Sequence, residues 1–311
     1  MICPGKNGAV LKEGIGLQSD PLSVTRWQFL AQQLDADAAP SIVDIGANPL
    51  DDTPYGPLLQ ARLCAVHGFE PQKDAFDKLQ TAKGPHETYH NLAVGDGGSH
   101  KLNVYQSSGL TSVYPLDAQT IRYLARDPRH ANVLETPTIE TIRLDDVTDI
   151  ARVDLLKIDV QGAETMIMTN GRAKLKDAVA VITELRFFPM YNGEPSLDAQ
   201  IAELASLGLL FHKPLFIKTQ PIANSQSKRL RTRRMGSQAL DGDAVFVRDL
   251  RDPATVSTHQ IKSLALLSDA VFHSHDLTLH CLDLLVARQA VAPDLPPRYV
   301  DYLPNIWKRP Q

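Results

Sequence analysis

Apolar runs the length of single strands alternate with longer helical stretches through most of this chain. The first run, Ser41 to Ile45, is short and rich in β-branched residues, as expected of a strand buried on both faces of a parallel sheet. Five runs are predicted as parallel strands: Ser41 to Ile45, Ala65 to Phe69, Glu87 to Val94, Val153 to Ile158 and Ala178 to Thr183. The pattern predicts an α/β fold with a mostly parallel sheet, whose last strand, Ala244 to Arg248, is antiparallel.

The same pattern divides the chain into three parts. Residues 1–40 are predicted to form an arm and an amphipathic helix, Asp20 to Leu34, that could wall one side of a cofactor cleft. Residues 41–250 form the sheet domain. Residues 251–311 form a helical extension and tail, with one or two amphipathic helices ending near Pro293. We expect this extension to pack on the domain or to mediate self-association into a homo-oligomer.

Composition narrows the classes of partner. The 311 residues are 43% hydrophobic and 22% charged, with a net charge of −4, so the chain has no overall attraction to nucleic acid or to anionic membranes. No apolar run approaches the roughly 18 residues of a membrane span. The three cysteines, Cys3, Cys64 and Cys281, are too scattered for a disulfide framework or a thiolate zinc site. These features predict a cytoplasmic protein without a membrane span or a nucleic-acid partner.

Three segments between the predicted elements each leave two interpretations open. Ser107 to Ser112 is a polar loop that either ends a hairpin or covers a substrate or cofactor as a lid. Phe187 to Pro195 either forms an apolar wall near the acceptor substrate of an enzyme or packs against the core. Lys228 to Arg234 is strongly basic and is either a solvated loop or a contact for an anion, such as a phosphate on a nucleotide sugar or lipid head.

The chemistry of the chain is concentrated in Ser41 to Pro71, a predicted strand, glycine turn, helix and second strand. Gly46 lets the backbone turn sharply, and the helix, Pro54 to Val66, would aim its first N–H groups at a ligand over that turn. Glu70 follows the second strand, where its carboxylate can accept two hydrogen bonds from a ribose diol. This arrangement suits a cofactor that contains a nucleoside.

The glycine spacing decides between the candidate cofactors. A dinucleotide fingerprint needs further glycines close after Gly46, and the next glycine is Gly56. S-adenosylmethionine (SAM) carries a nucleoside without phosphate, so it needs no anion cradle. The pattern favours SAM over a nicotinamide or flavin cofactor and over a bare structural turn.

Acidic residues follow the later strands. Asp159 comes directly after Val153 to Ile158, Glu184 lies at the tip of Ala178 to Thr183, and Glu164 lies on the next helix, Gly162 to Asn170. Parallel strands bring these acids to one edge of the sheet, although each could also be a solvated loop acid or a helix cap. We predict Asp159 as the general base, with Glu184 and Glu164 as the next candidates.

Metal ions are not expected at this site, although a divalent ion that bridges Asp159 and another acid would also activate a hydroxyl. His273, Asp276 and His280 have helical spacing on one face, but a third strong ligand and an open coordination position are not evident. The sequence therefore predicts no metal centre.

A series of short segments, in chain order, resembles the FkbM-type class I SAM-dependent methyltransferases over Ile42 to Asp249. The segments are VDIGAN, GFEP, NLAVGD, RLDDV, DLLKIDVQGAE, TELRFFPMY and GDAVFVRDL. The resemblance implies a Rossmann-like class I methyltransferase sheet, SAM as cofactor and methylation of a hydroxyl oxygen. It also implies the cofactor-binding positions: Asp44, Gly46, Ala47 and Asn48 at the methionine end, Glu70 and Pro71 at the ribose, and Asp96 near the adenine.

The sequence thus predicts an O-methyltransferase that acts on a hydroxyl of a sugar, a glycan or a secondary metabolite. One departure favours an alternative, a non-catalytic nucleoside-binding or assembly protein: Pro49 and Leu50 stand where the family pattern has a second glycine. A nicotinamide-dependent reductase is disfavoured by the missing glycines.

Overall fold

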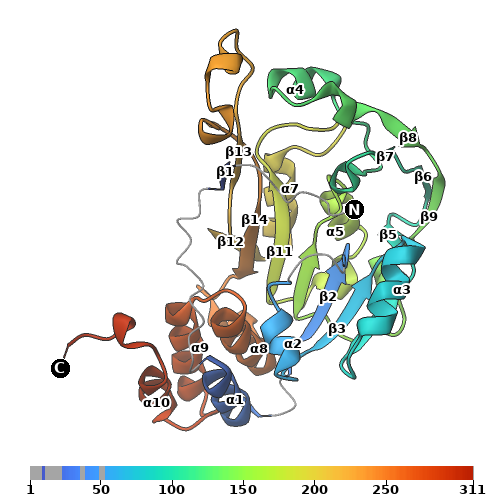
Figure 1. Ribbon diagram of the computed structural model, residues 1–311. Helices are drawn as coiled ribbons and strands as arrows, with labels where there is room; N and C mark the ends of the chain where they lie inside the picture. Colours follow the sequence, from blue (N-terminus) through green and yellow to red (C-terminus); the bar gives the residue numbers. More distant parts are fainter. Residues whose placement is uncertain (1–8, 11–22, 36–38, 49–52, 311) are drawn as a thin grey trace.

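A computed structural model describes residues 9–10, 23–35, 39–48 and 53–310 of the chain, and Figure 1 shows its arrangement. The described residues form a nine-stranded central sheet in the order β1-β13-β14-β11-β10-β2-β3-β4, with β12 also paired to β14. The strands are β1 Ala9–Val10, β2 Ser41–Ile45, β3 Ala65–Phe69, β4 Glu87–His90, β10 Leu155–Ile158, β11 Ala180–Arg186, β12 Leu209–Pro214, β13 Lys218–Gln220 and β14 Gln238–Arg248.

The directions of the strands confirm the predicted fold class. Strands β4, β3, β2, β10 and β11 are parallel neighbours, and β14 runs antiparallel to β11. The chain order reverses between β2 and β10, since β3 and β4 extend the sheet on one side and β11 extends it on the other. Ligands of open α/β sheets bind at such a switch point, beyond the carboxyl ends of the strands.

Helices cover both faces of the sheet. One face carries α1 Ser23–Leu34, α2 Gly56–Gln60, α8 Thr258–Ala270 and α9 His275–Ala287, with α10 Leu295–Asp301 beside them. The other carries α5 Glu164–Thr169, α6 Arg172–Leu175 and α7 Leu197–Ser206. Helix α3, Lys73–Ala82, packs on β4, and α4, Ala118–Tyr123, belongs to a third apolar cluster. The 3₁₀ helices are η2 Ser108–Leu110, η3 Pro128–Ala131, η4 Leu144–Asp146, η5 Ser227–Arg229, η6 Thr232–Arg234, η7 Pro253–Thr255 and η8 Asn305–Trp307.

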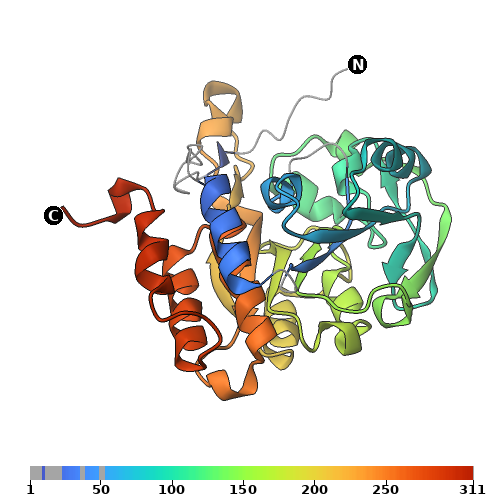
Figure 2. The same ribbon diagram turned by 90° about the horizontal axis from the view of Figure 1, so that it is seen from below.

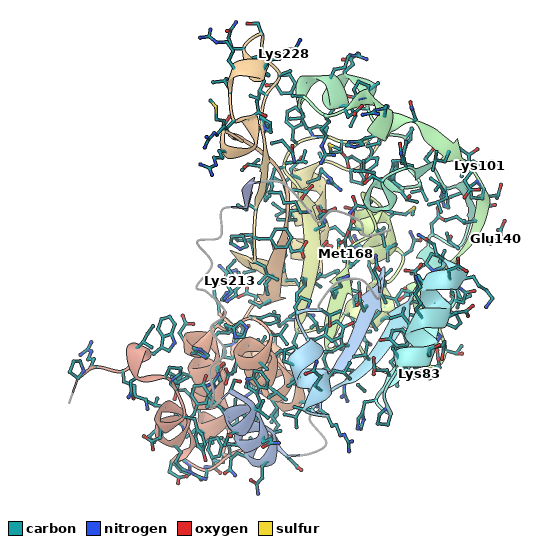
Figure 3. All side chains as sticks on the ribbon, in the orientation of Figure 1. Lys83, Lys101, Glu140, Met168, Lys213 and Lys228 are labelled. Carbon is teal, nitrogen blue, oxygen red and sulfur yellow. The ribbon has the colours of Figure 1, made fainter. Side chains whose placement is uncertain are left out.

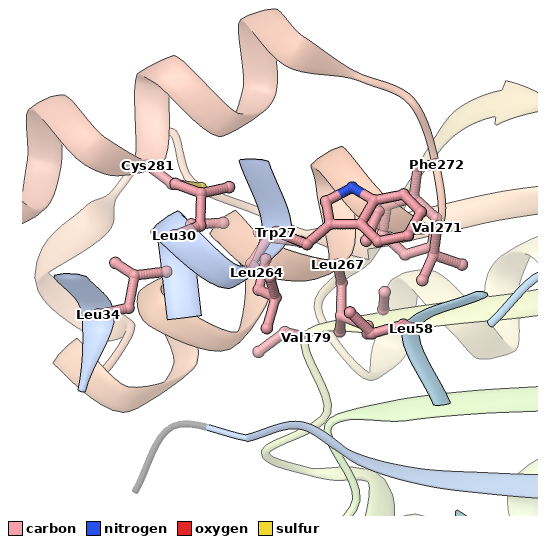
Figure 4. Close-up of a cluster of buried hydrophobic side chains, with 14 of the residues drawn as sticks. Trp27, Leu30, Leu34, Leu58, Val179, Leu264, Leu267, Val271, Phe272 and Cys281 are labelled. Atoms are coloured by element: carbon pink, nitrogen blue, oxygen red, sulfur yellow. The ribbon is translucent and has the colours of Figure 1, made fainter. Parts of the chain in front are cut away.

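The C-terminal helices and the sheet share one apolar core. Figure 4 shows Trp27 and Leu30 of α1 beside Leu264 and Leu267 of α8, with Val179, just before β11, in the same cluster. These side chains are almost fully excluded from solvent, so each contributes on the order of 2 kcal/mol of hydrophobic stabilisation. The predicted domain boundary at residue 250 stays a prediction, but this cluster crosses it without a break.

Helix α1 does not lie beside the cofactor turn. It packs on α8 and α10, and Figure 2 shows it alongside the C-terminal helices. The expectation that it walls the cofactor cleft is therefore wrong. Its apolar stripe was predicted correctly, but the stripe is covered by residues from the far end of the chain.

A buried ion pair fixes α1 to α8. The Nε and Nη2 atoms of Arg26 donate to the two carboxylate oxygens of Asp269, at 2.7 and 2.9 Å, and both side chains are almost completely buried. The Nδ1 atom of His275 lies 3.2 Å from the same carboxylate. Burial raises the pKa of Asp269, but hydrogen bonds from His275 and Arg26 outweigh it, and the net shift is downward. The carboxylate is therefore charged and needs its cation.

Replacing Arg26 by methionine is expected to destabilise the protein by about 3–5 kcal/mol, because it leaves a buried carboxylate without its main partner. Urea unfolding of the purified variant measures this. The matched control is Arg251→Met, which breaks an exposed pair with Asp249 and should leave the free energy of unfolding nearly unchanged. Equal losses in the two variants would show that the Arg26–Asp269 pair contributes nothing special to stability.

Several predicted elements differ in extent from those observed. A helix lies within the predicted range Pro54 to Val66, but its predicted extent is wrong, because α2 spans Gly56–Gln60 and Arg62 then takes a left-handed φ of 61° that turns the chain into β3. The predicted strand Glu87 to Val94 divides into two strands, β4 and β5 Ala93–Gly95. Only β4 belongs to the central sheet, because β5 belongs to a separate small sheet. The C-terminal region has a further helix, α10, whose first turn holds two prolines.

Two small sheets follow β4. Strand β5 and strand β6, Ser99–Lys101, flank β9, Thr138–Arg143, while β7, Val104–Tyr105, pairs with β8, Val133–Glu135. No helix in the described part of the chain is long and apolar enough to cross a membrane. Cys64 and Cys281 are free, buried thiols, and Cys3 lies outside the described residues.

Candidate active site

The glycine turn after β2 is held against the neighbouring strand ends. Gly46 adopts a φ of 84°, and a Cβ atom there would overlap the main-chain oxygen of Asp159. The N–H groups of Gly46 and Ala47 both donate to the carbonyl of Phe69, each at 3.1 Å. Only glycine therefore fits this position. The close approach brings the ends of β2, β3 and β10 together.

Asp44 lies beneath this turn and is completely buried. Its carboxylate accepts a hydrogen bond from the Tyr55 hydroxyl at 2.5 Å and lies 3.2 Å from the Lys157 ammonium. Burial lowers the pKa of Lys157, but the charges of Asp44 and Asp159 outweigh it and raise the pKa overall, so the lysine is charged. The contacts of Asp44 with Tyr55 and Lys157 thus fix the end of β2, from which the turn begins.

Glu70 follows β3 at the same edge of the sheet. Its Oε1 atom accepts from the N–H of Gln72 at 2.7 Å, and the side chain is only 6% exposed. The Asn91 amide donates to the main-chain oxygens of Glu70 and Pro71, at 2.9 and 3.0 Å. Burial raises the pKa of Glu70, with the Asp44 charge acting in the same direction. The hydrogen bond from Gln72 therefore holds the Glu70 side chain in place, and burial of the ionised carboxylate lowers the free energy of unfolding.

The other predicted cofactor positions lie around this pair. Ala47 is buried and Asn48 is exposed at the end of the turn, whereas Pro49 and Leu50 lie outside the described residues. Asp96 is exposed and hydrogen-bonds the N–H of Gly98 and the His100 ring, both at 2.8 Å, and the His100 bond lowers its pKa.

The structure brings together the three predicted catalytic acids. Asp159, Glu164 and Glu184 each place one carboxylate oxygen within 4.8 Å of the others. The side-chain amide of Gln161 donates to Asp159 at 2.8 Å and to Glu184 at 3.1 Å. Asp159 is half-buried, whereas Glu164 and Glu184 are buried. Among the three acids, Asp159 is therefore the best placed to meet an acceptor from solvent.

Glu164 holds the loop that carries Asp159. It accepts hydrogen bonds from the main-chain N–H groups of Val160 and Gly162, both at 3.0 Å. Burial raises its pKa, with the charge of Arg186 opposing that rise. Its geometry is that of a residue that positions the loop.

Glu184 lies inside β11 and not at its tip, so its predicted position is wrong. Strand β11 continues to Arg186 because Glu184 and Arg186 are both paired with residues of β14. The Arg186 guanidinium donates to the Glu184 carboxylate at 2.7 Å, and the Lys218 ammonium lies 3.7 Å from it. Burial raises the pKa of Glu184, and Arg186 opposes the rise.

The sequence analysis assigned no role to two residues that organise this site, Gln161 and Arg186, although both lie in segments that resemble the family. Gln161 takes a left-handed φ of 59°, and its side-chain oxygen accepts from the Tyr191 hydroxyl at 3.2 Å. Arg186 also bonds Asp241 at 3.1 Å and lies 3.6 Å from Glu194. The nearest signal was the Gln-Gly pair after Asp159, since a glycine there permits a tight loop.

Two of the open interpretations can be compared with the structure. Ser112 donates its hydroxyl to the Gln161 carbonyl at 2.6 Å, and Tyr191 reaches the Leu110 carbonyl at 3.1 Å, so the loop of residues 107–112 rests on the site. Met190 and Tyr191 are buried in the third apolar cluster, as the packing interpretation requires.

The basic stretch and the C-terminal histidines lie elsewhere. Lys228 is exposed at the end of an arm between β13 and β14, as Figure 3 shows. His273 precedes α9 and has a left-handed φ of 51°, so it does not share a helical face with Asp276 and His280. The spacing that suggested three ligands on one helix is therefore misleading.

Comparison with known proteins gives one extensive match. Residues 44–211, more than half of the chain, match the family model described as the methyltransferase FkbM domain. That segment runs from Asp44 to Phe211 and includes the three acids and Glu70. Among curated proteins, no sequence matches this chain significantly.

Several solved structures are similar in shape. Magnesium protoporphyrin IX methyltransferase from Synechocystis PCC 6803, with bound SAM, is 9% identical over 74% of this chain and 81% of its own, with a TM-score of 0.35. The N-methyltransferase NodS from Bradyrhizobium japonicum WM9 is 10% identical over 75% and 99% of the two chains, with a TM-score of 0.34. The StiE O-MT is 10% identical over 82% and 79%, with a TM-score of 0.38.

Proposed function

Since this chain belongs to the FkbM methyltransferase family, we propose that it uses SAM to methylate a hydroxyl oxygen of a sugar, a glycan or a secondary metabolite. The observation that carries the proposal is the pairing of the Gly46 turn with the buried Glu70 carboxylate, through the hydrogen bonds of Gly46 and Ala47 to Phe69. A nucleoside at this edge would meet a close backbone and a diol acceptor together.

Each end of the cofactor would have its own residues. Glu70, which follows β3, would accept hydrogen bonds from the two ribose hydroxyls, with Pro71 beside it. Gly46, Ala47 and Asn48 would line the methionine end, and Asp44 with Lys157 would hold that turn in shape. Asp96 would approach the adenine from the turn after β5. The glycine turn suits a ligand without phosphate, because the N–H groups of Gly46 and Ala47 already donate to the Phe69 carbonyl and are not available to an anion.

The acids of the site suit proton removal from a hydroxyl. Bound SAM supplies an activated methyl group for in-line displacement. Asp159, half-buried and held by Gln161, would accept the acceptor's proton, because a carboxylate in hydrogen-bond reach can do so as the new bond forms. Glu164 would fix the Asp159 loop through its main-chain bonds. Arg186 and Lys218 would hold Glu184 in place and offset the charge of the acid cluster.

Calorimetric titration of the purified full chain tests the cofactor. We expect SAM and its demethylated product to bind with micromolar dissociation constants and NADH not to bind. Binding of NADH alone would instead indicate a reductase. Failure of both SAM and its product to bind would overturn the cofactor assignment.

An acceptor screen tests the oxygen specificity. The protein is incubated with SAM and sets of sugars, glycans and hydroxylated metabolites, and methylated products are located by mass spectrometry and NMR. We expect the methyl group on an oxygen. A product methylated on nitrogen or carbon would leave the methyltransferase in place and refute the hydroxyl proposal.

A further inference from the structure

A second cluster of ligand-type side chains lies away from the acids. His67 is in the middle of β3, His90 ends β4, and Asp149 lies in the turn before β10. One ring nitrogen from each histidine and one carboxylate oxygen of Asp149 lie within 4.8 Å of one another. The two imidazole rings are nearly parallel, with centroids 5.8 Å apart and planes inclined by 12°. Strand pairing therefore presents both rings to the same place.

Two nitrogens of this cluster lack a hydrogen-bond partner. The Nδ1 atom of His67 and the Nε2 atom of His90 are both excluded from solvent, and neither makes a hydrogen bond to any described residue. The closest approach to an acid is 3.6 Å, from His90 Nε2 to Asp149 Oδ2, which is too long for a hydrogen bond. Leaving such groups unpaired costs about 1–3 kcal/mol each, so unpaired buried nitrogens call for a ligand.

We propose that His67, His90 and Asp149 bind a divalent transition-metal ion of the zinc class. Two imidazole nitrogens and one carboxylate are a ligand set that zinc and its neighbours accept, whereas Mg²⁺ prefers oxygen alone. Ligand atoms on one zinc ion lie about 3.4 Å apart for bonds of about 2.1 Å. The carboxylate is therefore close to the required distance already. Asp149 lies on an exposed turn, with 53% of its side chain accessible, so its carboxylate can move the small remaining distance toward His90. The same exposure gives the ion a path from solvent.

The surroundings favour a defined position for the rings. The His90 ring stacks on Phe69, which is fully buried, with centroids 4.7 Å apart. The His90 carbonyl accepts the N–H of Glu70 at 3.1 Å. An ion here would tie the β3–β4 edge of the sheet to the turn that contains Asp149. The proposal is independent of the methyltransferase assignment, because none of its ligands belongs to the acid cluster or the glycine turn.

Zinc titration of the chelator-treated, tag-free full chain tests the site. We expect one zinc ion per chain, a rise in melting temperature on zinc addition, and intense visible absorption with Co²⁺, which marks four-coordinate binding. His90→Gln and Asp149→Asn should each weaken zinc binding at least tenfold and remove the rise in melting temperature. The matched control is His86→Gln, an exposed histidine just before β4, which should bind zinc as the unaltered chain does.

Three results of the zinc titrations would overturn the proposal. These are no zinc binding by the unaltered chain, unchanged affinity in Asp149→Asn, or loss of binding in His86→Gln. Asp149→Asn decides the matter even if His90→Gln fails to fold, because Asp149 is exposed and outside the apolar clusters. Titration with Mg²⁺ completes the test, since saturation by Mg²⁺ in preference to Zn²⁺ would contradict a nitrogen-containing site.

Discussion

Glu70→Ala is expected to abolish SAM binding while the protein stays folded. In the proposed complex the carboxylate accepts two hydrogen bonds from the ribose, and hydrogen bonds to a charged group contribute about 1.5–3 kcal/mol each. Losing both corresponds to a fall in affinity of about a hundredfold or more. Calorimetry with SAM measures this. Unchanged affinity would remove Glu70 from the ribose site.

The isosteric variant Glu70→Gln separates binding from folding. Burial raises the pKa of Glu70, so the folded state disfavours its ionised form. A carboxyl group whose pKa is raised on folding contributes fully to the free energy of unfolding at pH values below its pKa in the unfolded state. This contribution is lost as the pH rises through its pKa in the folded state. At neutral pH the ionised acid therefore costs stability. We expect Glu70→Gln to melt no lower than the unaltered protein at pH 7, yet to bind SAM poorly.

Glu140→Gln is the matched control for both Glu70 variants. Glu140 lies on β9 at the outer edge of the molecule, where it hydrogen-bonds Ser99 (Figure 3). Its replacement should change neither SAM affinity nor melting temperature appreciably. Loss of SAM binding in this control would show that removal of any acid weakens binding through the overall charge.

Asp159→Asn is expected to lower turnover by about 10²–10⁴-fold with SAM affinity within a few-fold of the unaltered protein. The asparagine keeps an oxygen that can accept from Gln161, now at 2.8 Å from Asp159, so the loop keeps its shape while the proton acceptor is lost. The expected signature is a fall in kcat with little change in binding.

Asp177→Asn is the matched control for the catalytic test. Asp177 is exposed and lies just before β11, at the opposite end of that strand from the acids. Its turnover should equal that of the unaltered protein. Full turnover in Asp159→Asn would exclude Asp159 as the base, and a large loss of SAM affinity would place it in the cofactor site instead.

Much of the framework could be predicted from local pattern. The first two parallel strands were placed at their observed bounds, and the antiparallel last strand was identified, because short, mostly apolar runs between turn signals indicate buried strands. Glycine at position 46 was assigned to a turn, and it has the left-handed φ that such a turn requires. Helix ends were less accurate, since α2 stops at Gln60 through a backbone turn at Arg62 that the sequence does not mark.

The sequence by itself determined the fold class and the group of acids at one edge, because strand periodicity and strand order depend on local composition and chain direction, and its series of short segments carried the resemblance to the family. Tertiary structure alone decided that Glu164 and Glu184 are buried while Asp159 is half-buried, that Glu184 lies within β11, and that Gln161 and Arg186 hydrogen-bond to members of this acid cluster. It also decided that α1 meets α8 and that His67 meets His90 and Asp149. These are contacts between distant segments, set by packing and register that no local pattern records.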